Sequence, residues 1–404
     1  MTEHICIVGG GMAGLYCAYQ LLKSGRPVLL FEKDKNLGGR MLTEIVQEKD
    51  KTYYLEGGAG VIRNDETDII QLLKDLRVEM NFWKSGTALV YNDGEKSKIL
   101  DLNLEKVLRK VCSNSSNDKS FLRTIEIAPV TEEEKTALVI GTTYSELLEA
   151  NSEHVCQEND WYEFTVPSSE EIKFGKPSKG WQDFIDKITE KILEMGGKIF
   201  VNSPVKEIGN GYLKVKGVQE KIPYSDIIIT TPIHFLENVK LNYALNTWVE
   251  VAKLYIRETN YLRIYSYFEK PLEITMKICT NLSIRRVIPI NQNIIMTVYT
   301  DGMDATQINA LSKDQNKLNR YIESQLGLLL GRKIPKIKKS WVFYWPKGIS
   351  SWKPSDKPVE QILPILQHPY PNIHFCGDSY SMHPGWLEGA VESSDQVIEH
   401  IIKS

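Results

Sequence analysis

The first forty residues constrain the fold more than any other part of the chain. His4–Gly9 is an apolar strand, Met12–Lys23 is a helical stretch ended by Ser24–Gly25, and Pro27–Phe31 is a second strand. A strand, a helix and a second strand within about 30 residues are typical of a βαβ unit with parallel strands. The sequence therefore predicts an α/β fold that contains a Rossmann-like, cofactor-binding domain.

Three glycines connect the first strand to the helix, and an acid follows the second strand. Gly9 makes the tight turn, Gly11 lets a pyrophosphate approach the backbone, and Gly14 lets the helix pack against the strand. The amino end of the helix offers free N–H groups to the phosphates. Glu32 stands where an acid binds ribose hydroxyls, which favours FAD or NAD over NADP.

In the rest of the chain, segments with a helical pattern alternate with segments with a strand pattern. Helical periodicity is found over 68–80, 100–111, 132–150, 181–195, 313–330 and 386–402. Strand patterns are found over 198–201, 227–230, 255–299 and 373–376. We therefore expect a discontinuous cofactor-binding domain of three segments, 1–70, 173–235 and 345–404. The intervening segments, 71–172 (helical) and 236–344 (sheet and helix), are expected to form an α+β substrate-binding domain.

Composition excludes several classes of protein. The 49 Lys and Arg residues nearly balance the 52 Asp and Glu residues, so a nucleic-acid partner is not expected. The sequence has no apolar run of about 18 residues, no basic amino-terminal region with a cleavage site, and no apolar tail after Ile402. A signal peptide and a membrane anchor are therefore not expected, and a cytoplasmic location is.

Cysteine and histidine spacing give two further predictions. The six cysteines include no CxxC pair, which predicts neither a disulfide framework nor a zinc site and favours a reducing compartment. The seven histidines show no HxxxH or HxH spacing, so no metal site is predicted.

Three more segments are rich in small residues. They are Leu37–Arg40 (LGGR), Tyr54–Ile62 (YLEGGAGVI), and the carboxy-terminal blocks HFCGD (374–378) and HPGWLEGA (383–390). Small residues permit close approach to a planar ring, and the last block opens a second helix whose amino end can support the far end of a long cofactor.

With these motifs in this order, the chain resembles the flavin-containing amine oxidase family, which includes monoamine and polyamine oxidases. The similarity also covers KGWQDFIDKI, GGKIFVNSPVKEI and IIITTP in the middle of the chain. It is closer to the compact amine-oxidase-like proteins of large DNA viruses than to the mitochondrial enzymes.

The resemblance implies roles for individual residues toward FAD. Gly9, Gly11 and Gly14 would hold the pyrophosphate, Glu32 the adenosine ribose, and the backbone of Val205 the adenine. Gly39 and Arg40 would flank the pyrophosphate and ribityl chain, while Gly58 and Ala59 would lie near the isoalloxazine ring. In the Gly377–Asp378 turn, Asp378 replaces the usual Glu. Leu387 and Ala390 would lie near the pyrimidine side of the flavin. Trp386 would form one wall of the substrate cage.

Two departures from the family pattern affect the chemistry. Arg263 stands where the family has a Lys that reaches flavin N5 through a water, and an Arg stays charged and cannot relay a proton. It could anchor a water or a negative substrate group, or be a salt-bridged residue on a strand. The segment Lys347–Ser350 (KGIS) lacks the cysteine that binds flavin in the mitochondrial enzymes, so the FAD is expected to be non-covalent.

The second wall of the aromatic cage stays open among Tyr344, Trp345 and Trp352, and ordinary core packing is the simpler interpretation of each. Trp345 is the candidate that we place with Arg263 and Trp386 at the catalytic site. His383 is a weaker candidate for a catalytic base than for a loop hydrogen bond. The basic run 332–339 is interpreted as a solvated face, with a contact to a polyanion or a partner as the alternative.

The activity that the resemblance implies is oxidation of a small-molecule amine. A hydride would pass from the amine C–H to flavin N5, the imine would hydrolyse to an aldehyde, and oxygen would be reduced to hydrogen peroxide. Two alternatives are a flavin-dependent desaturase or oxidase of a larger lipophilic substrate, and a non-catalytic flavin-binding scaffold.

Overall fold

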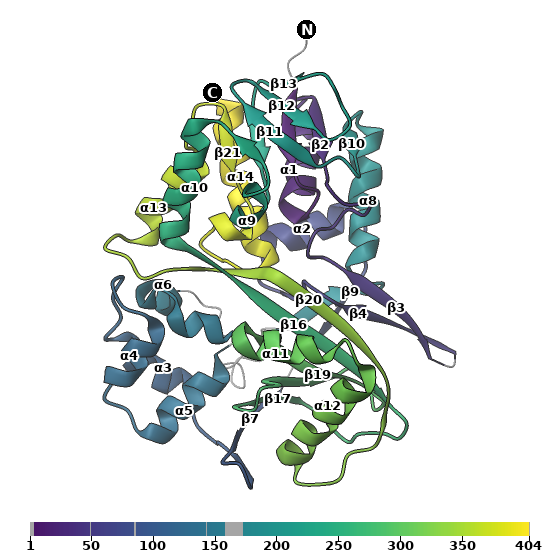
Figure 1. Cartoon of the computed structure of the whole chain (residues 1–404), viewed down its shortest axis with the longest axis vertical. Coiled ribbons are helices and arrows are strands. Elements are labelled where there is room, and N and C mark those ends of the chain that lie inside the picture. Colours follow the sequence, from purple (N-terminus) through teal and green to yellow (C-terminus); the bar gives the residue numbers. More distant parts are fainter. Residues whose placement is uncertain (1–3, 49, 85, 143, 158–172, 404) are drawn as a thin grey trace. The chain divides into compact units, whose positions relative to one another are not determined.

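The structure is a computed structural model that describes residues 4–403 apart from 49, 85, 143 and 158–172 (Figure 1). The chain divides into two compact units. Unit 1 contains Met1–Phe82, Phe174–Arg257 and Val359–Ser404, and unit 2 contains Trp83–Lys173 and Glu258–Pro358.

Three of the four predicted joins lie elsewhere in the structure. The join expected near 70 falls after Phe82, because α2 (Thr67–Asp75) buries Ile69 and Leu72 in the core of unit 1. The join expected near 235 falls after Arg257, since α10 (Tyr243–Tyr255) stacks its Trp248 on Phe375 of unit 1. The join expected near 344 falls after Pro358, because strand β20 continues without a break to Trp352.

The main sheet of unit 1 has five parallel strands contributed by all three of its segments. Their order is β10 (Lys198–Phe200), β2 (Val28–Phe31), β1 (Ile5–Val8), β14 (Ile227–Ile229) and β21 (Ile373–Phe375). The three central strands are runs of apolar residues, as expected for parallel strands covered on both faces. The predicted Rossmann-like α/β fold is confirmed.

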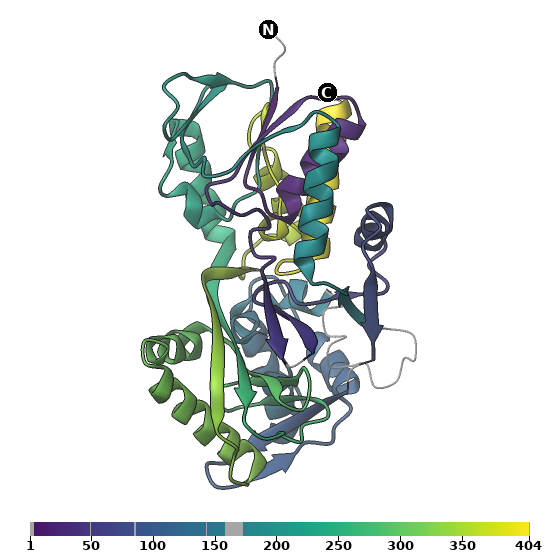
Figure 2. The same ribbon diagram turned by 90° about the vertical axis from the view of Figure 1, so that its right-hand side faces the viewer.

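Three long helices of unit 1 lie side by side, namely α1 (Met12–Lys23), α8 (Trp181–Glu194) and α14 (Leu387–Lys403) (Figures 1 and 2). Helix α8 follows Gly180 and buries Trp181, Phe184 and Ile188, which recur at the three-to-four-residue spacing of one helix face. These side chains join those of α1 and α14 in one core cluster.

Smaller elements complete unit 1. A four-stranded sheet has the order β13 (Ile222–Pro223), β12 (Tyr212–Val215), β11 (Val205–Gly209) and β15 (Lys240–Leu241), and a three-stranded sheet has the order β5 (Ile62–Arg63), β9 (Phe174–Pro177) and β6 (Met80–Trp83). The remaining elements are the hairpin of β3 (Thr43–Glu48) and β4 (Lys51–Glu56), the helices α9 (Ile233–Leu236) and α13 (Val359–Gln367), and the 3-10 turn η3 (Asp378–Tyr380).

Unit 2 is built on a mixed seven-stranded sheet. The strand order is β20 (Ile337–Trp352), β16 (Ile256–Phe268), β19 (Ile294–Asp301), β18 (Arg286–Pro289), β17 (Lys277–Thr280), β7 (Thr87–Asn92) and β8 (Ser97–Ile99). The β17–β7 pair is parallel, whereas β16–β19, β18–β19, β17–β18 and β7–β8 are antiparallel.

Within the described residues of unit 2, the helices are α3 (Leu104–Cys112), α4 (Phe121–Ile127), α5 (Glu132–Gly141), η1 (Ser145–Glu149), α6 (Ser152–Gln157), α11 (Gly302–Leu311) and α12 (Gln315–Leu330). Polar side chains cap the amino ends of several of these helices. Thr131 and Glu134 form a reciprocal capping box at α5, and the Asp314 carboxylate accepts two backbone N–H bonds at α12.

A disulfide joins Cys112 at the end of α3 to Cys156 in α6, which corrects the cysteine prediction. The partners are 44 positions apart, and only the packing of α3 against α6 brings them together, so their sequence spacing gives no sign of the bond. The cysteines therefore no longer support a reducing compartment. None of the helices in the described residues is both long and apolar enough to cross a bilayer.

Candidate functional site

The glycine turn of unit 1 connects β1 to α1. Gly9 has a φ of +109°, which favours glycine, and a Cβ on Gly14 would lie 1.9 Å from the Gly9 carbonyl oxygen. The helix begins at Met12, and Gly11 before it has no side chain, so the first N–H groups have no side-chain cap. This end of α1 meets the requirements of a pyrophosphate group: uncapped N–H donors and no Cβ in the way.

Glu32 follows β2 and reaches back to this turn. Its buried carboxylate accepts N–H bonds from Gly10 at 2.7 Å (Oε2) and from Asp34 at 2.8 Å (Oε1). Each oxygen keeps a further acceptor site, as ribose hydroxyls would need. Val205 starts β11 close by, because the N–H of Ser203 donates to the Glu32 carbonyl oxygen.

The LGGR segment packs directly on the glycine turn. Gly38 and Gly39 have φ angles of +109° and +57°, and the Gly38 N–H donates to the Gly10 carbonyl oxygen at 2.8 Å. A Cβ on Gly39 would lie 3.1 Å from the Gly11 Cα. Two glycine turns from different motifs therefore form one backbone-lined cradle.

Arg40 and Asp378 form an ion pair across 338 positions of the sequence. Arg40 Nη1 donates to Asp378 Oδ2 at 2.8 Å, and Nη2 donates to Oδ1. The N–H of Gly385 also donates to Oδ2, at 3.2 Å. The Asp378 side chain is buried, whereas the Arg40 side chain is 28% exposed. The pair thus connects the first and third segments of unit 1, a contact that the sequence motifs did not predict.

Small residues pack on the backbone beside Arg40. A Cβ on Gly58 would lie 1.7 Å from the Arg40 carbonyl oxygen, to which the Ala59 N–H donates at 2.9 Å. Ala59 and Leu387 border the core cluster that contains Ala390. Residues of the segment 54–62 and of the block 383–390 that were predicted near the flavin ring thus lie in or against the same core cluster of unit 1.

Trp386 precedes α14 and is partly buried. Its neighbour His383 pairs through Nδ1 with Glu392 Oε2 at 2.8 Å, a local contact across the first turns of α14. This contact favours the loop hydrogen-bond interpretation of His383.

Unit 2 buries Arg263 among tyrosines. Arg263 lies on β16 and donates from Nη2 to the Tyr299 hydroxyl at 2.9 Å, with the centre of its guanidinium 4.3 Å from the centroid of the Tyr299 ring. The Tyr144 and Tyr299 hydroxyls are hydrogen-bonded to each other. Burial opposes the charged form, but the neighbouring tyrosines, Tyr299 first, raise the pKa of Arg263 above its ordinary value. Burial, followed by Tyr299, also raises the pKa of Tyr144.

Trp345, one of the three competing aromatic residues, contacts a tyrosine beside Arg263. Its ring stacks on Tyr261, with centroids 6.4 Å apart, and Tyr261 lies beside Arg263. A Cβ on Gly348 would lie 2.6 Å from both Trp345 and Tyr261, so the glycine permits this packing. Trp352 is instead fully buried against His154, and the Tyr344 hydroxyl accepts a bond from Asn260.

Three of the five basic residues in the run 332–339 form ion pairs. Arg332 lies 3.8 Å from Glu273, Lys336 2.7 Å from Glu323, and Lys338 3.1 Å from Glu269. These surface pairs are consistent with a solvated face.

Comparison with known proteins places the chain in a family. The family described as "Flavin containing amine oxidoreductase" matches residues 12–171 and 160–402. The chain is 29% identical over 134 residues to Lysine-specific histone demethylase 1 homolog 2 of Arabidopsis thaliana, covering 32% of this chain and 18% of that protein. It is 34% identical over 80 residues to an L-amino-acid oxidase of Siganus canaliculatus, covering 20% of this chain and 15% of that protein. These alignments span less than a fifth of each relative's length, and neither supports a viral grouping.

Similar solved structures cover the whole chain. A double mutant of putrescine oxidase matches with a TM-score of 0.80 at 15% identity, covering 100% of this chain and 99% of that one. The wild-type putrescine oxidase bound to putrescine matches with a TM-score of 0.79 at 15% identity and 100% coverage of both chains. Cyclohexylamine oxidase from Brevibacterium oxydans matches with a TM-score of 0.79 at 16% identity, covering 100% and 99%. The structures share the fold, and the family match shows that the chain belongs to the flavin-containing amine oxidoreductases, a family of enzymes.

Proposed function

We propose that this enzyme is an amine oxidase that holds FAD without a covalent bond and acts on a small amine. The observation that carries the proposal is the continuous glycine cradle of unit 1 in a chain that belongs to a flavin-containing amine oxidoreductase family. FAD would supply the oxidation, taking a hydride from the carbon beside the amine nitrogen and passing the electrons to oxygen, which gives hydrogen peroxide and an imine that hydrolyses to an aldehyde.

Unit 1 would hold the cofactor along its length. The uncapped start of α1, with Gly9, Gly11 and Gly14, would bind the pyrophosphate. Glu32 would accept from the adenosine ribose, and the backbone of Val205 would contact the adenine. Support comes from the position of Ser203, which ties the start of β11 to Glu32.

The ion pair would shape the middle of the cofactor site. Gly39 and Arg40 would border the pyrophosphate and ribityl chain, and the Gly377–Asp378 turn would lie on the same side, since Asp378 binds Arg40. The shorter acid is compatible with this role, because it already spans to both Arg40 and Gly385. Gly58, Ala59, Leu387 and Ala390 would border the flavin ring.

Three residues would contact the substrate: Arg263, Trp345 and Trp386. Hydride transfer needs a neutral amine, but an alkylammonium in water has a pKa of about 10.4 and is protonated at neutral pH. Each unit by which the site lowers this pKa corresponds to about 1.4 kcal/mol. Aromatic walls at Trp345 and Trp386 would disfavour the ammonium form. Arg263 would stay charged and orient a water or a negative group, and would not carry protons.

Two observations support the absence of a covalent bond between the protein and the flavin. The segment Lys347–Ser350, which corresponds to the flavin-binding segment of the mitochondrial enzymes, contains no cysteine. The four free cysteines of the described residues are all buried. A putrescine-bound relative and a cyclohexylamine oxidase with the same fold support an amine as substrate.

The test combines cofactor release with turnover. Acid precipitation of the purified yellow protein should leave the flavin in the supernatant, and aerobic turnover of mono-, di- or polyamines should release hydrogen peroxide. Flavin retained in the pellet would contradict non-covalent binding. An absence of peroxide with every amine would contradict the proposed activity and favour another substrate or a scaffold.

A further inference from the structure

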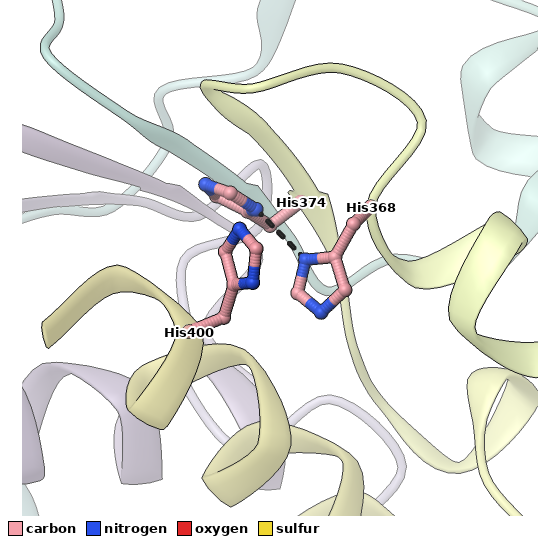
Figure 3. Close-up of side chains that lie close together, drawn as sticks. All are labelled: His368, His374 and His400. Atoms are coloured by element: carbon pink, nitrogen blue, oxygen red, sulfur yellow. Dashed lines mark hydrogen bonds between the residues drawn. The ribbon is translucent and has the colours of Figure 1, made fainter. Parts of the chain in front are cut away.

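Three histidines from separate elements meet at the edge of the parallel sheet of unit 1 (Figure 3). His368 follows α13, His374 lies on the edge strand β21, and His400 lies in the last turn of α14. Nitrogen atoms of the three rings all lie within 4.8 Å of one another. Their sequence separations of 6 and 26 positions match no metal motif, which is why the sequence predicts no metal site.

The hydrogen bonds around His374 fix which of its nitrogens is free to bind a metal. Its Nε2 lies 3.2 Å from Asp226 Oδ1, and a carboxylate only accepts, so Nε2 carries the proton. The lone pair of Nδ1 then points at His368 Nδ1, 3.1 Å away. A carboxylate that holds the far nitrogen of an imidazole is the usual second partner of a metal-bound histidine.

The spacing of the nitrogens suits a small transition-metal ion. Two nitrogens at 2.0–2.1 Å from a tetrahedral ion are about 3.3 Å apart, close to the observed separation of the His368 and His374 Nδ1 atoms. The His400 ring stacks on that of His368, with centroids 4.1 Å apart. His400 is exposed and can rotate to bring a third nitrogen to the ion.

Each imidazole must present a lone pair to the ion, so it binds in its neutral form. When His368 binds through Nδ1, its proton moves to Nε2, so the ring stays neutral.

We infer that His368, His374 and His400 form a binding site for a divalent transition metal of the zinc class, with Asp226 as the positioning residue. Imidazole ligands favour Zn²⁺ and its neighbours over Mg²⁺ or Ca²⁺. The strands β1 and β14 are parallel; Asp226 precedes β14, and the glycine turn follows β1. The histidine cluster and the glycine turn therefore lie at opposite ends of these strands. The metal would therefore tie α13, β21 and α14 together away from the cofactor cradle, and its role would be structural.

The test is equilibrium dialysis of the tag-free, chelator-treated flavoprotein against Zn²⁺, followed by metal analysis. We expect one Zn²⁺ per chain and a higher thermal unfolding midpoint with the ion. His400→Gln changes an exposed ligand with little risk to folding and should weaken binding at least tenfold. Asp226→Asn keeps an acceptor for His374 and should weaken binding about 10–100-fold.

His234→Gln is the matched control, because His234 lies on α9 outside the cluster. It should leave Zn²⁺ affinity unchanged. The inference is overturned if the wild-type protein binds no stoichiometric Zn²⁺, if His400→Gln binds within twofold of wild type, or if His234→Gln weakens binding as much as His400→Gln.

Discussion

At the scale of single residues, Arg263 is the departure with the largest chemical consequence. Its planar guanidinium donates to the Tyr299 hydroxyl while lying over the Tyr299 ring, and an ammonium cannot reproduce both contacts. The family's lysine is therefore not a conservative replacement in this chain.

Arg263→Lys should lower the rate constant of flavin reduction by roughly 10–100-fold, since a preorganised charged donor of this kind is worth a few kcal/mol to a reaction. Stopped-flow reduction over a range of amine concentrations separates this limiting rate from binding. Arg320→Lys, on the exposed face of α12, is the matched control and should not change the rate. Equal rates for wild type and Arg263→Lys would make Arg263 a structural residue.

Asp378 compensates the charge of Arg40, and removing its charge should weaken unit 1. Asp378→Asn should lower the free energy of unfolding by about 1–2 kcal/mol, a value reduced because Arg40 is partly exposed. Asp378→Glu keeps the charge and should recover most of the loss. Denaturant titrations of the three proteins measure these differences, and equal stabilities would show that the ion pair contributes nothing.

Glu66 gives unit 1 a defined pH dependence. Burial raises its pKa to about 8, although Arg63 lies 3.7 Å away and acts in the opposite direction. An acid whose folded pKa is raised stabilises the fold below its unfolded pKa, and this stabilisation is lost as pH rises from about 4.5 through 8.

Glu66→Gln keeps the side chain neutral at every pH. At pH 8.5 the free energy of unfolding of this variant should be about 1–3 kcal/mol higher than that of the wild type. At pH 5 the difference between the two proteins should be much smaller. Glu79→Gln, at an exposed position, should show no such dependence. A difference between Glu66→Gln and wild type that stays the same at both pH values would contradict this assignment.

At the scale of elements, the disulfide ties α3 to α6 in the helical part of unit 2. Closing a loop of 44 positions should stabilise unit 2 by about 2–4 kcal/mol. A thiol assay on the denatured, unreduced protein should count four free thiols among its six cysteines.

Reduction of the wild type, and the Cys112→Ser/Cys156→Ser double variant, should lower the unfolding midpoint by the same amount. Six free thiols, or a midpoint that reduction does not move, would show that the bond is absent.

Elements with strong local signals could be predicted from the sequence. The strand, glycine turn and helix at the amino terminus are confirmed, and α1 has the predicted limits of 12 and 23. The helix predicted over 68–80 ends at Asp75, because Arg77 turns the chain with a φ of +55° before β6. Helix α13 was missed because Pro364 lies inside it and interrupts the helical pattern.

Contacts between distant segments could not be predicted in this way. The motifs locate Arg40 and Asp378 separately, but only the fold pairs them. The same holds for Cys112 with Cys156, for the tyrosines around Arg263, and for the three histidines. Each of these sets depends on side chains from different strands or helices, which periodicity along one segment cannot reveal.

At the scale of the whole molecule, the chain crosses between the two units four times and so contributes five segments. The largest sheet of each unit is completed by segments from distant parts of the sequence: the parallel sheet of unit 1 draws on all three of its segments, and the mixed sheet of unit 2 draws on both of its own. A cut at any one join would therefore leave unit 1 incomplete, and a cut at either of the two middle joins would also divide unit 2, so function is expected only of the intact chain.

We propose that the intact chain oxidises an amine with bound FAD. The most direct measurement is the absorbance of the purified flavoprotein mixed anaerobically with mono-, di- and polyamines and with amino acids. We predict that at least one amine bleaches the yellow flavin band and that admitting oxygen restores it with release of hydrogen peroxide. A flavin that stays oxidised with every amine would contradict the claim.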